Sequence, residues 1–196
     1  MIVENATFKP QIKALFELAN TSLNPSIFKA KCETFAKFDE SGSDDSYWRF
    51  QVGEEFALLV GIDTNGITEQ QNREPQVTSA ILSFCWWESF SKSDHKTIDS
   101  YDRERERFDQ LFKQSLEETV NILGQPLLTG KDADEMAHKY AIWRGKTCLL
   151  ILQQSAYDLQ FGLDLNYWIQ TWSGADPEPT SPLIEWLFIQ GEKTEE

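Results

Sequence analysis

The sequence contains few of the side chains that carry chemistry. Its 196 residues include two histidines, and its three cysteines, Cys32, Cys85 and Cys148, are widely spaced with no C-x-x-C pair. An odd number of dispersed cysteines fits a reducing cytosol better than a disulfide framework. Each cysteine falls in an apolar segment predicted to be a strand, which favours buried, inert thiols over nucleophiles.

Complete catalytic, phosphate-binding and metal-binding motifs are also absent. Gly145–Thr147 resembles the end of a phosphate-binding loop, but Tyr140 stands where that motif needs its first glycine. Glu135-x-x-His138 has a metal-ligand spacing, yet the other histidine, His95, lacks the matching glutamate that a di-iron site requires. We therefore predict no catalytic, cofactor-binding or metal-binding residue, and no cofactor. A carboxylate-only mechanism stays open, because the sequence cannot show which acidic residues lie close together.

Long apolar runs and an excess of basic charge are missing as well. The longest apolar runs, such as Cys148–Leu152, are far too short to span a bilayer, and Met1–Asn5 lacks the pattern of a secretory signal. The chain carries 32 acidic against 18 basic residues, a net charge of −14. This balance argues against a nucleic-acid surface or an anionic membrane surface. We expect a cytoplasmic protein that binds neither nucleic acid nor membrane.

The acidic charge gathers in two blocks. Residues 39–75 have nine acidic and two basic side chains, and residues 154–196 have eight and one, so each block carries −7 while the rest is neutral in sum. If the two blocks meet in space, they form one face that would attract a basic protein partner. If they lie apart, the charge serves solubility alone.

Hydrophobic periodicity predicts the order of the elements. Apolar residues at i, i+3 and i+4 predict helices over residues 9–20 and 102–123, and Gly124 and Pro126 end the second helix. A short apolar helix is predicted from Ser181 to Gln190. Alternation with a period of two predicts strands over residues 27–38, 47–52, 55–63, 77–87, 140–143, 147–153 and 157–168.

This order predicts an α+β fold in which about seven antiparallel strands are covered by helices on one face. We expect a single domain over residues 1–196 with a frayed tail at 191–196. Within it, residues 1–100 and 101–190 look like two helix-plus-meander halves, although no residue-level repeat proves a duplication.

Seven tryptophans are present, and two of them are adjacent. Neighbours on a strand point to opposite faces, so Trp86 continues the core face of Ala80 and Leu82 while Trp87 shares a half-polar face. Either a loop or the last helix covers Trp87, or it anchors a partner. The last helix, which contains Trp186, is apolar nearly all round and needs burial on two sides.

The candidate partner-binding residues are outward acids and tryptophans: Asp39, Glu40, Asp44, Asp45, Trp87, Asp158, Asp164 and Trp186. We expect a small acidic protein-binding module of bacterial type, more readily than an enzyme, that neutralises or escorts a protein partner of basic charge. In class, size and charge the chain resembles bacterial toxin-immunity proteins and secretion chaperones, although no motif residue carries this resemblance. One alternative is a small-ligand or carboxylate enzyme site between sheet and helices; another is a structural homodimer through the last helix or the polar sheet face.

Overall fold

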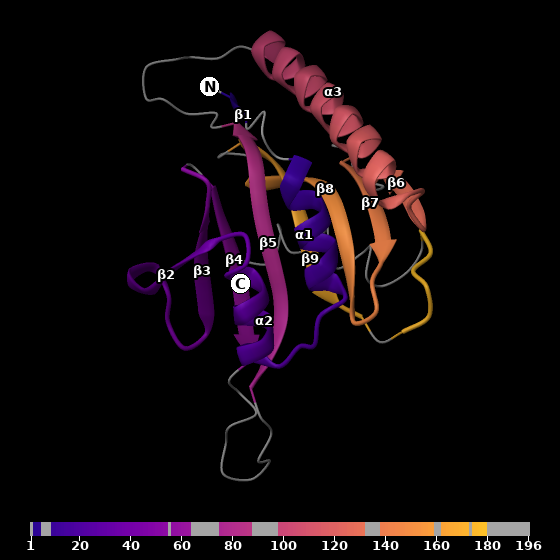
Figure 1. Cartoon of the computed structure of the whole chain (residues 1–196). Coiled ribbons are helices and arrows are strands. Elements are labelled where there is room, and N and C mark those ends of the chain that lie inside the picture. Colours follow the sequence, from indigo (N-terminus) through magenta and orange to yellow (C-terminus); the bar gives the residue numbers. More distant parts are fainter. Residues whose placement is uncertain are drawn as a thin grey trace, which may run out of the picture.

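The computed structural model describes residues 2–4, 9–54, 56–63, 75–87, 98–131, 138–158, 162–172 and 174–179. These ranges form one antiparallel sheet of nine strands and three α-helices, which confirms the predicted α+β fold (Figure 1). The strand count exceeds the predicted seven by two because β1 and β6 are too short to show an alternation. The elements are β1 (Ile2–Glu4), α1 (Lys9–Ala19), α2 (Pro25–Cys32), β2 (Lys37–Asp39), η1 (Glu40–Gly42), β3 (Tyr47–Val52), β4 (Phe56–Asp63), β5 (Gln76–Trp87), α3 (Ile98–Leu123), β6 (Leu128–Lys131), β7 (Lys139–Arg144), β8 (Cys148–Asp158) and β9 (Gly162–Thr171).

The sheet consists of two four-stranded meanders that meet at its centre. Its strand order is β2-β3-β4-β5-β9-β8-β7-β6, and β1 pairs with the end of β5. We call α1, α2 and β2–β5 the first half, and α3 and β6–β9 the second half. The last strand of each half forms the central seam, where Ala80 pairs with Ile169 and Leu82 with Tyr167. Both halves therefore place helices before a meander, while a duplication stays a prediction.

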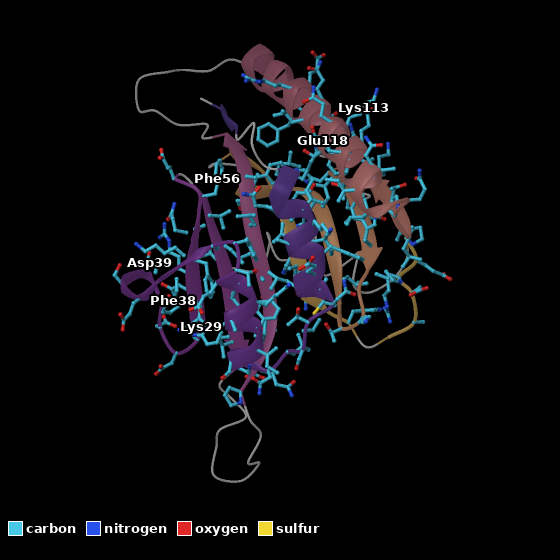
Figure 2. All side chains as sticks on the ribbon, viewed as in Figure 1. Lys29, Phe38, Asp39, Phe56, Lys113 and Glu118 are labelled. Atoms are coloured by element: carbon cyan, nitrogen blue, oxygen red, sulfur yellow. The ribbon has the colours of Figure 1, made fainter. Side chains whose placement is uncertain are left out.

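The three helices pack on one face of the sheet, which we call the inner face (Figure 1). Leu15 from α1, Phe28 from α2 and Phe108 from α3 belong to a single core cluster with Leu58 and Tyr167 of the sheet, and all five are almost completely buried. Side chains fill the space between the helices and the strands in Figure 2. The inner face therefore holds a packed core.

Helix α2 lies where a strand over residues 27–38 was predicted, and that prediction is wrong. The Oδ1 atom of Asn24 accepts hydrogen bonds from the backbone N–H groups of Ser26 and Ile27, at 3.1 and 3.3 Å. Pro25 follows this cap in the first turn, where proline is well tolerated. Phe28 and Cys32 are then one turn apart and both buried. Only Lys37–Asp39 becomes a strand.

Several other predicted elements are confirmed. Helix α3 ends at Leu123, and Gly124 follows with a φ of +86°, as a C-terminal glycine should. The hairpin of β3 and β4 turns at Gly53, whose φ of +67° also favours glycine. Strand β8 runs on to Asp158, and β9 begins at Gly162, so the strand predicted over 157–168 is divided between these two.

The turn between β7 and β8 ties the two halves together across the inner face. Thr147 Oγ1 donates to the carbonyl oxygens of Ala19 and Thr21, at 3.0 and 2.7 Å. The backbone N–H of Lys146 donates to Asn20 Oδ1 at 2.9 Å. A Cβ atom at Gly145 would lie 2.4 Å from the Ala19 carbonyl oxygen, so this close approach requires glycine. The second half thus satisfies the free carbonyls at the end of α1.

No helix in the described ranges is long and apolar enough to cross a membrane.

Candidate binding face

One row of side chains crosses the face of the sheet opposite the helices, which we call the outer face. Cross-strand pairing places one residue from each of the eight strands in the order β2-β3-β4-β5-β9-β8-β7-β6 in register, so their side chains share that face. This outer row consists of Asp39, Arg49, Leu59, Ile81, Trp168, Ile151, Ile142 and Leu128. It begins with an ion pair at the edge of the first half and continues as apolar residues through the second half.

The part of the outer row in the second half is covered. Ile142 and Ile151 have no exposed surface, and Trp168 and Trp172 pack against the same cluster. The chain turns just after Trp172, whose Nε1 donates to the Ala175 carbonyl oxygen at 2.7 Å. Arg144 holds the same segment, through a hydrogen bond from Nη2 to the Gly174 carbonyl oxygen and an ion pair with Asp176 at 3.7 Å.

The part of the outer row in the first half is open. Leu59 exposes 46% of its surface. Arg49 on β3 is the cross-strand partner of Leu59, and Tyr47, two residues before Arg49, exposes 41%. The residues two positions away from Leu59 on β4, Ala57 and Gly61, are small. Neighbouring exposed apolar side chains that form one patch on a sheet face are typical of interaction surfaces.

An acidic loop borders this open area at the edge of the sheet. Its first acid, Asp39, accepts hydrogen bonds from Ser41 Oγ and the Gly42 backbone N–H, and lies 3.6 Å from Arg49 Nε. The Ser41 hydrogen bond is the main cause of the lowered pKa of Asp39. Asp39 therefore serves mainly to build the loop.

Asp44 plays a similar role at the other end of the loop. It accepts hydrogen bonds from the Ser46 side chain and from the backbone N–H groups of Ser46 and Tyr47, and the Ser46 side chain is the main cause of its lowered pKa. Glu40 and Asp45 are exposed, and their carboxylates have no hydrogen bond or ion pair within the described part of the chain. Of the four predicted acids in this loop, Glu40 and Asp45 are thus the two that can receive a partner's charge.

Asp164 was predicted to face outward and bind a partner, and it is instead buried. It does belong to the outer face, but only 6% of its surface is exposed. Ser83 Oγ and Asn166 Nδ2 each donate a hydrogen bond to its Oδ2 atom at 3.0 Å. Burial raises the pKa of Asp164 despite these hydrogen bonds. The alternation of apolar and polar residues correctly predicted that Asp164 lies on the outer face. It could not predict that this part of the outer face is buried.

The predicted faces of the tryptophan pair rested on an unbroken strand, and β5 is interrupted. A register shift between Ser83 and Cys85 places Trp86 opposite Asp164 and Trp87 opposite Leu163. An extra residue in one strand interrupts the alternation of its side chains between the two faces. The faces of the tryptophan pair therefore cannot be predicted by counting along the strand from Ala80. The side chains of Trp87 and Asp158, and the whole of Trp186, lie outside the described residues.

The described acids of the two charge blocks lie apart. Asp39 belongs to β2 and Asp164 to β9, which are four strands apart in the sheet. This separation is roughly 19 Å at the usual spacing of about 4.8 Å between strands. Among the described residues, the acids that border the open area therefore belong to the first block.

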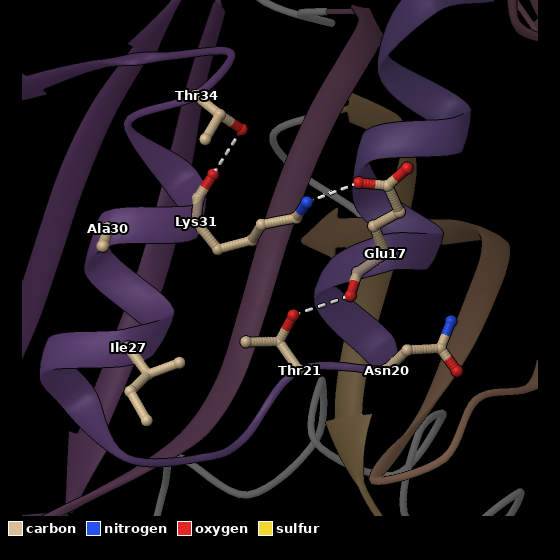
Figure 3. A pocket seen from close by; sticks show the side chains of 7 residues that line it. All are labelled: Glu17, Asn20, Thr21, Ile27, Ala30, Lys31 and Thr34. Atoms are coloured by element: carbon tan, nitrogen blue, oxygen red, sulfur yellow. Dashed lines mark hydrogen bonds and ion pairs between the residues drawn. The ribbon is translucent and has the colours of Figure 1, made fainter.

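A groove of about 580 Å³ between α1 and α2 is a second candidate (Figure 3). Its polar groups already pair with one another: Lys31 forms an ion pair with Glu17 across the groove, and Thr21 donates to the Glu17 carbonyl oxygen. Ile27 remains 53% exposed at its rim. The groove offers an apolar contact but no convergent reactive groups.

Neither a metal-binding cluster nor a reactive thiol is found among the described side chains. Those ranges contain no group of three His, Cys, Asp or Glu side chains able to hold a metal ion. Cys32 and Cys148 are buried as expected, and burial raises the pKa of Cys32 to about 12 and also raises that of Cys148. Such thiols are poor nucleophiles at neutral pH. The Cys85 side chain lies outside the description.

Sequence reasoning missed Leu59 and Tyr47. A signal for Leu59 was present, because Phe56, Leu58 and Val60 alternate toward the core and leave Leu59 as a large apolar residue on the opposite face.

Searches for a matching family model, curated protein or solved structure find none for this chain.

Proposed function

We propose that this protein is a protein-binding module of the bacterial cytoplasm that neutralises or escorts a partner, and that the partner docks on the open part of the outer face. The observation that carries the proposal is the exposure of Leu59, because Ile142 and Ile151 of the same outer row are buried in the second half. A leucine side chain gains roughly 1.5–3 kcal/mol when it is fully transferred from water. A partner that covers Leu59 would recover a part of that free energy.

The surroundings of Leu59 fit the anatomy of a protein interface. An apolar centre with an aromatic residue nearby and a polar rim is the usual arrangement, and Tyr47 and the loop carrying Glu40 and Asp45 supply these parts. The space between sheet and helices is filled by the core, which favours the outer face over an inner ligand pocket.

Site-specific photo-crosslinking in the native host tests this proposal. A photoreactive phenylalanine replaces Leu59 in one variant and Ile27, which has a similar exposure on the helix side, in a matched control. We expect one discrete adduct with another protein at position 59 and none of that mass at position 27. No adduct at position 59, or the same adduct at both positions, would refute the proposal.

A further inference from the structure

We infer that the partner presents a cationic segment with aliphatic side chains to the open area around Leu59, an inference that rests on the proposed function. The segment's aliphatic side chains would cover Leu59 and Tyr47, and its Lys or Arg residues would reach Glu40 and Asp45.

The acidic loop is held beside the apolar residues by the backbone. The N–H of Asp44 donates to the Tyr47 carbonyl oxygen at 2.9 Å, and the N–H of Ile62 donates to the Ser46 carbonyl oxygen at 2.8 Å. These hydrogen bonds fix the loop against the ends of β3 and β4. A partner lying on Leu59 therefore comes close to the exposed carboxylates of the loop.

The charge in this area is acidic in sum. The cations on the outer face of β2 and β3 are Lys37 and Arg49, and Arg49 already faces Asp39 at 3.6 Å. Four acids lie between residues 39 and 45, and Asp63 ends β4 in an exposed position. A cationic segment gains from this field and associates faster because of it.

The aromatic and aliphatic surface fits the same segment. Tyr47 exposes 41% of its surface beside the loop, where a Lys or Arg side chain can lie over its ring. Lys29 makes this kind of contact within the protein, with Nζ 3.6 Å from the centre of the Phe38 ring (Figure 2). Ala57, two residues before Leu59 on the same face of β4, is small, so it does not shield Leu59 from a partner on that side.

A second copy of this chain is a poor occupant. Its net charge is also −14, and a two-fold dimer through this face would bring two identical acidic borders together. Opposite charge therefore selects a different, basic protein.

Two synthetic peptides of equal length test the inference by NMR titration of the isotope-labelled protein. One is an amphipathic peptide of lysine and leucine, and the other replaces each lysine by glutamate. We expect the lysine peptide alone to shift the amide signals of β3 and β4, with an affinity that falls at least tenfold between 0.05 and 0.5 M NaCl.

Variants locate the contact. Leu59→Asp should weaken lysine-peptide binding at least tenfold, and the double substitution Glu40→Gln and Asp45→Asn about threefold to tenfold. The matched variant Ile27→Asp should leave it unchanged, and thermal melts of all variants should confirm that they are folded.

The outcomes separate this inference from the proposed function. Equal binding of both peptides, no binding of the lysine peptide, or signals that shift only in α1 and α2 would overturn the cationic segment. A crosslinked partner at position 59 would leave the proposed function intact in each of these cases. Concentration-dependent broadening of β3 and β4 signals without peptide would identify a second copy as the occupant and overturn the inference.

Discussion

The two halves of the sheet share a topology but differ in what covers their outer faces. In the second half, Ile142 and Ile151 are fully buried, whereas in the first half Leu59 occupies the same outer row and is 46% exposed. Trp168 and Trp172 pack against the cluster that contains these isoleucines, and Arg144 donates a hydrogen bond to the chain that follows Trp172. Equal strand patterns therefore do not imply equal surfaces, because the residues that pack on each face differ.

The largest expected effect tests this difference directly. Ile151→Ala should lower the free energy of unfolding by about 3 kcal/mol, because it opens a cavity in a covered cluster. Leu59→Ala, in the same row, should change it by about 0.5 kcal/mol or less. Urea titrations followed by circular dichroism measure both values. Equal losses would show that the outer faces of the two halves are equally buried.

The contact between the halves should have an intermediate effect. Thr147→Val removes two hydrogen bonds to the end of α1 and should cost about 1–2 kcal/mol. Thr21→Val removes a hydroxyl that bonds only within α1, and it serves as the control with a smaller loss. Urea unfolding gives the loss, and hydrogen exchange shows where it acts. If Thr147→Val changes the protection of backbone amides in the second half only, this contact does not join the two halves.

Helix α2 has no counterpart among the described residues of the second half, so its cap tests an element of the first half. Asn24→Ala should lower the free energy of unfolding by about 1 kcal/mol, because two backbone N–H groups lose their acceptor. Asn24→Asp keeps an accepting oxygen and should retain most of the stability. Thermal unfolding compares the two variants, and equal melting temperatures would speak against the cap.

The smallest effects are expected in the pH dependence, with opposite signs in the two halves. Burial raises the pKa of Asp164 in the folded state, so its unfavourable contribution is absent below the unfolded pKa of about 3.9 and grows as pH rises through the folded pKa. Asp164→Asn should therefore stabilise the protein at pH 7, with an advantage that disappears below about pH 4.

Asp39 provides the opposite case in the first half. The Ser41 hydrogen bond lowers the pKa of Asp39, so its contribution is present above the unfolded pKa and is lost as pH falls through the folded pKa. Asp39→Asn should therefore destabilise the protein at pH 7 and have less effect in acid. Urea midpoints at pH 7 and pH 4 measure both variants, and stability changes of the same sign would contradict the assignment.

The elements with local signals could be predicted from the sequence. Helix α3 ended at its glycine, and the β3–β4 hairpin turned at Gly53, because both positions need a backbone that glycine adopts easily. Helix α2 was missed because its residues also alternate between apolar and polar, and because Asn24-Pro25, a pair that often marks a turn, here caps a helix. A short sequence that fits both the helical period of 3.6 and the strand period of 2 cannot show which of the two structures forms.

The candidate binding face depended on information that is not local. The outer row exists because seven strand pairings bring distant residues into register. The interruption of β5 at Ser83 shifted the register before the tryptophan pair, and nothing in the sequence marks that shift. The burial of Asp164 likewise follows from cover by other parts of the fold.

The central seam has a consequence for the synthesis of the chain. One edge of β5 pairs with β4 and β1, but its other edge pairs with β9, the last of the described strands to be made. Residues 88–161 must therefore be translated before that edge finds its partner, which takes roughly 4–15 s at 5–20 residues per second. During this interval the nascent first half carries an unpaired strand edge, the kind of surface that ribosome-associated chaperones protect from aggregation.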